Sequence, residues 1–95
     1  MAAYVIVQVG VRDPAKFEAY RAQVPATLKR FGGEFIVRGG AMEVLEGTWA
    51  QPRCVVIKFP DMKSAKAWYS SPEYAGPKAL RQASANANMI VVEGV

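Results

Sequence analysis

The order of hydrophobic patterns along this chain is the feature that most limits what it can fold into. Residues 4–11 are apolar and β-branched, which predicts a strand with both faces largely covered. Asp13-Pro14 supplies a helix N-cap followed by a proline at the first helical position. A helix should follow, because apolar side chains recur at steps of three or four: Phe17, Tyr20, Val24, Leu28 and Phe31. We expect Pro25 to bend this helix and Gly32-Gly33 to end it.

Two further strands are predicted after this helix. Residues 34–38 form the second strand, and Gly39-Gly40 forms the turn that closes it. The alternating segment from Ala41 to Gly47 is expected to pair back as a short hairpin arm. Residues 53–59 predict a third strand, in which four side chains share one face: Arg53, Val55, Ile57 and Phe59.

The aromatic segment from Ala67 to Tyr74 contains a helix break. Asp61 can cap a helix that enters this segment. Ser71-Pro72 then ends that helix and begins another, with serine as the N-cap and proline at the first helical position. The second helix should reach about Ala83, which gives a helix pair in place of one long helix.

Residues 89–93 predict the last strand, and Asn86 and Asn88 are interpreted as turn residues before it. The predicted order is therefore strand, helix, strand, strand, helix pair, strand. This is the split βαβ pattern of the ferredoxin-like α+β fold, with one antiparallel sheet. We expect residues 1–95 to form a single domain.

The same pattern predicts a homodimer. Helices would cover only one face of the sheet, while the strands are apolar on both faces. A chain of 95 residues has no spare helix and buries a modest fraction of its surface. A second copy is the natural cover, which gives a two-fold dimer with facing sheets, a dimeric α+β barrel.

Composition excludes several classes of function. The chain has no histidine, which removes the commonest metal ligand and general base and the usual haem ligand. Cys54 is the only cysteine, so no internal disulfide or thiolate metal cluster is expected, and we predict neither a metal nor a cofactor. The net charge of +4 comes from scattered basic residues, which argues against nucleic-acid binding. The longest apolar runs are too short to span a membrane, and no signal peptide is recognisable, so a cytoplasmic location is expected.

Several segments together resemble the family called domain of unknown function 1330, within the dimeric α+β barrel superfamily. The segments that carry the resemblance span most of the chain: Phe31-Gly32-Gly33, Val37-Arg38-Gly39-Gly40, Leu45-Glu46-Gly47, residues 53–60, residues 67–74, Arg81 and Val92-Glu93-Gly94. The chain departs from the family pattern at Phe31, where a tyrosine is frequent, and near Lys58, where an acid is frequent.

The resemblance implies the ferredoxin-like fold and the dimer, but no particular reaction. Relatives in the superfamily include cofactor-free monooxygenases, muconolactone isomerases, haem-dependent enzymes and amino-acid-sensing domains. A shared fold does not by itself establish a shared reaction. The absence of histidine makes the histidine-ligated haem branches poor candidates.

Two arginines are candidates for binding an anion. Arg38 precedes two glycines, so a ligand could approach the backbone closely there, and its guanidinium suits carboxylate or phosphate. Arg53 begins a strand on the face shared with Val55 and Ile57, and could point into the cleft below the sheet. The alternative for both is a structural ion pair, with these partners: Glu43, Glu46 or Glu93 for Arg38, and Glu46 for Arg53.

The helix pair supplies the remaining candidates. Trp68 is expected to anchor the helices to the sheet and to form part of a pocket wall. Tyr69 and Tyr74 could line the pocket, or could be core residues with satisfied hydroxyls. Arg81 could reach an anion in the cleft, or could pair with Glu73.

These residues predict a homodimer that binds a small anionic organic ligand in a pocket between the sheet and the helix pair. The proposed ligand-binding residues are the following: Arg38, Arg53, Trp68, Tyr69, Tyr74 and Arg81. Cofactor-free isomerisation or oxygenation is the chemistry that such residues could support. The alternative is a non-catalytic dimerisation or ligand-sensing domain in which the polar residues are structural.

Overall fold

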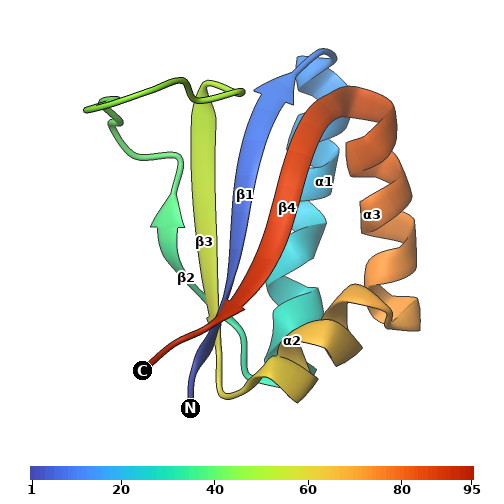
Figure 1. The fold of residues 1–95 in the computed structure, drawn as a ribbon. Helices are drawn as coiled ribbons and strands as arrows, with labels where there is room; N and C mark the ends of the chain where they lie inside the picture. The colour runs from blue at the N-terminus through green and yellow to red at the C-terminus, as the bar shows by residue number, and fades with distance from the viewer.

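Four strands form one antiparallel sheet, and helices pack on one of its faces (Figure 1). The computed structural model describes all residues from 1 to 95. The strands are β1 (Ala3–Val11), β2 (Glu34–Arg38), β3 (Arg53–Phe59) and β4 (Ala85–Glu93). The helices are α1 (Pro14–Leu28), the short 3-10 helix η1 (Lys29–Phe31), α2 (Met62–Tyr69) and α3 (Pro72–Ser84).

The strand order across the sheet is β2-β3-β1-β4, and every neighbouring pair is antiparallel. Helix α1 connects β1 to β2, while β3 inserts between these two strands. This is the split βαβ arrangement that the sequence pattern predicts. The ferredoxin-like α+β fold is therefore confirmed.

Local capping positions the helices as expected. The side chains of Asp13, Asp61 and Ser71 each accept a hydrogen bond from the backbone amide three residues further on. These bonds satisfy amides that the first helical turn leaves unpaired. Gly32 ends the first helical segment with a positive φ of 72°, and α1 continues through Pro25 without ending there.

The core lies between the inner face of the sheet and the helices. Alternate residues of β1 are buried, and the fully buried Trp68 and Tyr74 pack against each other with ring centroids 4.1 Å apart. The indole Nε1 of Trp68 donates a hydrogen bond of 3.0 Å to Thr27 Oγ1, so its polar atom is satisfied inside the core. Trp68 thus joins α2 to α1 beneath the sheet.

The predicted hairpin arm is wrong. No strand forms between β2 and β3, and residues 39–52 run as an exposed loop that extends away from the sheet (Figure 1). Leu45 in this loop is 88% exposed. The alternating pattern is not sufficient to form a hairpin here, because an isolated two-stranded ribbon is only marginally stable in water.

The predicted start of the last strand is also wrong. β4 begins at Ala85, directly after α3, so Asn86 and Asn88 lie within the strand, opposite Gly10 and Gln8 of β1. Pairing with β1 therefore outweighs the local preference of asparagine for turns.

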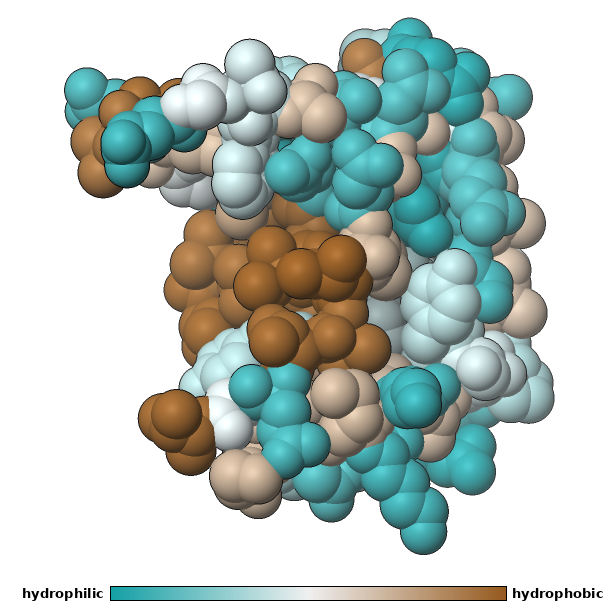
Figure 2. Space-filling model, viewed as in Figure 1, coloured by the Kyte–Doolittle hydropathy of each residue, from teal (hydrophilic) through white to brown (hydrophobic).

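The second face of the sheet carries no helix. Ile6 and Val56 are partly buried there, and Val37, Ile90 and Val92 are exposed to at least 40%. Figure 2 shows an apolar patch over the sheet on the face turned to the viewer. We call these five residues the open sheet face.

None of the helices combines the length and the apolar composition that a membrane crossing requires.

Candidate functional site

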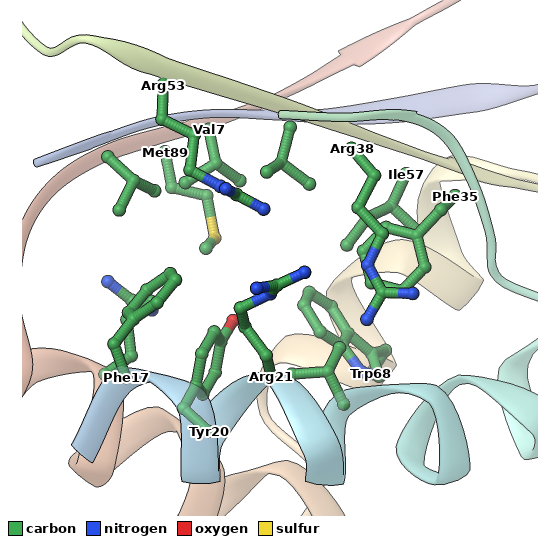
Figure 3. A pocket seen from close by; sticks show the side chains of 14 residues that line it. Val7, Phe17, Tyr20, Arg21, Phe35, Arg38, Arg53, Ile57, Trp68 and Met89 are labelled. Carbon is green, nitrogen blue, oxygen red and sulfur yellow. The ribbon is translucent and has the colours of Figure 1, made fainter. Parts of the chain in front are cut away.

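A small pocket lies between the inner face of the sheet and helix α1 (Figure 3). Its volume is about 30 Å³, which is enough for one or two water molecules. Most of the lining side chains are hydrophobic: Val7, Val9, Phe17, Tyr20, Val24, Phe35, Val55, Ile57, Trp68 and Met89. The pocket is therefore largely apolar, and its polar character comes from a few other residues.

Four arginines line this apolar pocket, and no carboxylate does. Arg21 comes from α1, Arg38 ends β2, Arg53 begins β3, and Arg81 lies on α3. Figure 3 shows the guanidinium groups of Arg21, Arg38 and Arg53 pointing into the space between the sheet and α1. We call these three residues the arginine cluster.

A β-bulge directs Arg38 into the pocket. Phe35 pairs with Ile57 and Arg38 pairs with Val55, but the register shifts between Phe35 and Val37. In a regular strand, residues 35 and 38 would point to opposite faces. The extra residue of the bulge places both on the face of Val55 and Ile57, which is the helix side.

Gly39 makes room for the neighbouring arginine. A Cβ atom at Gly39 would lie 2.5–2.8 Å from the guanidinium atoms of Arg53. Gly39 also has a positive φ of 69°, and its amide donates a hydrogen bond of 2.9 Å to the carbonyl of Cys54. Only glycine combines this conformation with such a close approach without strain. The turn after β2 therefore fixes where the Arg53 guanidinium can lie.

The positive charge of the arginine cluster is hardly neutralised within the chain. The protein has only two ion pairs, and the single one that involves the cluster joins Arg21 to the largely exposed Glu18 at 3.1 Å. The Nε atoms of Arg21 and Arg53 are buried and have no hydrogen-bond partner in the protein. Burial, and then the charges of Arg21 and Arg38, hold the pKa of the Arg53 guanidinium below its usual value. Unpaired buried donors in native proteins are uncommon, and they call for an explanation.

Aromatic rings support the arginines in place of acids. The guanidinium carbon of Arg38 lies 4.3 Å from the ring centroid of Phe35, and that of Arg53 lies 6.0 Å from the ring of Phe17. Such cation–π contacts orient a guanidinium without cancelling its charge. The hydrogen-bonding capacity of Arg38 and Arg53 thus remains available to a ligand.

A buried pair of tyrosines forms another polar feature of the pocket. The hydroxyls of Tyr20 and Tyr74 lie 2.9 Å apart, and Arg81 Nε donates a 3.4 Å hydrogen bond to the Tyr74 hydroxyl. Burial and the adjacent Tyr74 raise the pKa of Tyr20 above its usual value, so this phenol stays protonated. Tyr20 is the only tyrosine among the lining residues, and it can act as a neutral hydrogen-bond donor.

The structure brings four of the six predicted site residues to this pocket: Arg38, Arg53, Trp68 and Arg81. The predicted alternative ion pairs of these arginines do not form, and Glu73 pairs with Arg30 at 2.6 Å and not with Arg81. No group of three or more His, Cys, Asp or Glu side chains is placed to hold a metal ion.

Tyr69 and Tyr74 do not line this pocket, although Tyr69 borders two wider hollows beside β4. The restart of the helix at Ser71 turns Tyr74 inward, where it is fully buried between Trp68 and Tyr20. Tyr69 ends α2 and is 39% exposed, with Lys78 Nζ 4.2 Å from its ring centroid. Trp68 takes the core-facing position of α2, and Tyr69, about 100° further round the helix, lies on its exposed side.

Arg21 was not identified from the sequence as a site residue. Tyr20 was placed only on the apolar stripe of the first helix. A usable signal existed, because Arg21 lies four residues after Phe17 and three before Val24. Those steps place it on the buried face of α1. A charged residue on such a face is the pattern that indicates a functional role.

Comparison with known proteins fits this architecture. A family model described as domain of unknown function, DUF1330, matches residues 2–95. The chain belongs to the DUF1330 family. No curated protein matches the sequence.

Solved structures similar to this DUF1330 protein share its fold at low sequence identity. A protein of unknown function from Rhodopseudomonas palustris has a TM-score of 0.80 at 16% identity, with 99% of this chain and 82% of that chain covered. A dimeric ferredoxin-like protein of unknown function from Jannaschia sp. CCS1 has a TM-score of 0.79 at 14% identity, with 99% and 100% covered. SnoaB from Streptomyces nogalater, a cofactor-independent oxygenase, has a TM-score of 0.64 at 14% identity, with 99% and 93% covered. At this identity the similarity establishes the fold alone.

Proposed function

We propose that this DUF1330 protein binds a small organic anion in the pocket between the sheet and α1. The observation that carries the proposal is the arginine cluster, in which two buried Nε atoms lack partners and no carboxylate lines the space. An apolar pocket with a few convergent polar groups is the usual form of a small-molecule site.

The energetics favour an anion in particular. Bringing three guanidinium groups together raises the free energy of the unliganded protein, since like charges repel and burial removes water. A carboxylate can accept two parallel hydrogen bonds from one guanidinium. Hydrogen bonds to charged groups contribute about 1.5–3 kcal/mol each, so two or three of them suffice for measurable binding.

A thermal-shift screen tests the proposal directly. Small carboxylates, phenols and phosphates would be tested on the native protein, on Arg53→Gln and on Arg30→Gln as a matched control outside the pocket. A ligand at about a hundred times its Kd stabilises by about 2.7 kcal/mol, which corresponds to roughly 11–22 °C for a domain of this size. We expect carboxylates to shift the native protein and Arg30→Gln but not Arg53→Gln. Equal shifts in all three proteins, or no shift with any anion, would contradict the proposal.

We also propose that the protein is a homodimer formed through the open sheet face. The support is the apolar patch on that face, together with the dimeric description of the related protein from Jannaschia. Ile90, which is 59% exposed, should be central to the contact. Ile90→Glu is expected to sediment as a monomer at micromolar concentration, while Leu45→Glu in the exposed loop should sediment as the native protein does. A native monomer would refute this part.

A second candidate is that the pocket is catalytic, as a cofactor-free isomerase or monooxygenase. The observation in its favour is the protonated Tyr20 hydroxyl beside the arginine cluster, since such a phenol can donate a hydrogen bond to a developing enolate oxygen while the arginines stabilise its negative charge. The similarity in fold to SnoaB supports it by analogy only. Turnover that falls in Tyr20→Phe, with ligand affinity retained, would support catalysis. Binding without turnover of any bound compound would favour a sensing role for the same pocket.

We place this function in the cytoplasm, as a proposal from composition. Cys54 is a free thiol and the only cysteine, so the chain cannot form the internal disulfides that are typical of proteins in oxidising compartments.

A further inference from the structure

The number of charges in the pocket limits which anions fit. Four guanidinium groups line it, and the only acid bonded to any of them is Glu18, whose side chain is 71% exposed and therefore largely screened by solvent. Arg81 donates its hydrogen bond to the Tyr74 hydroxyl and not to an acid. The three guanidiniums of the arginine cluster carry three positive charges, so a single carboxylate ligand would leave two of them uncompensated. Two acid groups would leave one, which the exposed Glu18 beside Arg21 partly offsets.

The positions of the arginines limit how far apart those acid groups can lie. Arg38 and Arg53 are on adjacent strands, next to each other at the paired ends of β2 and β3. The close approach of the Arg53 guanidinium to Gly39 keeps it beside the residue that follows Arg38. Arg21 faces both from α1 (Figure 3). The donors therefore converge on one small region, and they do not lie at the two ends of a long channel.

The volume limits the rest of the ligand. A cavity that binds benzene measures about 150 Å³, whereas the pocket beneath the arginine cluster measures about 30 Å³. Its wall is apolar, with the rings of Phe17 and Phe35 on either side. A space for one or two water molecules holds at most about two carbon atoms of an apolar body, so an aromatic ring does not fit. The charged groups of a ligand must then lie towards the pocket mouth, where Arg38 is exposed.

We propose that the ligand is a small dianion with two carboxylates on adjacent carbon atoms and a short apolar body. This proposal rests on the proposed function, because it specifies the anion that the arginine cluster binds. The two carboxylates lie among Arg21, Arg38 and Arg53, and the short body lies against the apolar wall. Each carboxylate supplies acceptors that the unpaired Nε donors lack.

Isothermal titration of the full chain with four probes tests the proposal. Maleate carries two carboxylates on the same side of a double bond, fumarate carries them on opposite sides, butyrate carries one, and inorganic phosphate has no apolar body. We expect maleate to bind at least about tenfold more tightly than each of the other three, since a factor of ten needs only about 1.4 kcal/mol. In Arg53→Gln and in Arg38→Gln, the ratio of the maleate and butyrate affinities should fall towards one. Arg30→Gln should preserve the ratio.

The outcomes separate this inference from the proposed function. If butyrate or fumarate binds as tightly as maleate, the proposal of two carboxylates side by side on adjacent carbon atoms is wrong, but the pocket is still an anion site. If phosphate binds as tightly as maleate, the proposal that the ligand has an apolar body is wrong. If none of the four probes binds, both proposals fail for anions that this pocket can hold. Because Arg38 is exposed at the pocket mouth, Arg38→Gln provides the test if Arg53→Gln does not fold.

Discussion

Removing one charge from the arginine cluster should stabilise the unliganded protein while it weakens binding. Arg53→Met keeps a long unbranched side chain but removes the guanidinium, whose buried Nε has no partner. An unpaired buried donor costs about 1–3 kcal/mol. The lost cation–π contact with Phe17, at 6.0 Å, contributes only about 0.5–1 kcal/mol. The difference predicts a net gain of about 1 kcal/mol, or about 4–8 °C in Tm for a domain of this size.

Thermal and urea unfolding of the native protein and Arg53→Met would measure this gain. Repulsion from Arg21 and Arg38 should be screened as the Debye length falls from about 30 Å at about 0.01 M salt to about 3 Å at about 1 M. The stabilisation should therefore be largest at low salt. The control, Arg30→Met, loses an exposed ion pair with Glu73 and should gain nothing. If Arg53→Met melts below the native protein at low salt, the cluster is not a site of electrostatic strain and the reasoning is refuted.

Three further predictions concern the elements that position the pocket. Gly39→Ala should lower stability by about 1 kcal/mol or more, because the added Cβ meets the Arg53 guanidinium at a positive φ, and titration should show weaker anion binding. Thr27→Val should lower the free energy of unfolding by about 1–3 kcal/mol, because it leaves Trp68 Nε1 without its acceptor; a urea curve unchanged from the native one would contradict this. Hydrogen bonds from the first turn of α2 lower the pKa of Asp61, so its contribution to stability is present above its unfolded pKa and is lost as the pH falls through its folded pKa. Acid titration of Tm should therefore show a smaller loss in Asp61→Asn than in the native protein; equal losses would argue against the cap.

Much of the fold could be predicted because its signals are local. The helix caps at Asp13, Asp61 and Ser71 each depend on one side chain and an amide three residues away. The buried face of β3 follows from strict alternation, which any paired strand must obey. The errors occurred where a local preference competed with tertiary pairing. Asn88 lies in β4 because β1 offers a pairing edge, while the alternating segment after Gly40 finds no such partner.

The sequence by itself determined the element order, the caps and the apolar faces, since these depend on residues that are near one another in the chain. It also indicated Arg38 and Arg53 as possible anion ligands. Only the tertiary structure decided that a bulge in β2 points Arg38 inward and that Arg21 of α1 faces it from the opposite layer. The tertiary structure also decided that Tyr20 lines the pocket and that Tyr69 and Tyr74 do not. A side chain's direction at a bulge and the meeting of residues from separate layers depend on pairing register and packing, and no local pattern encodes them.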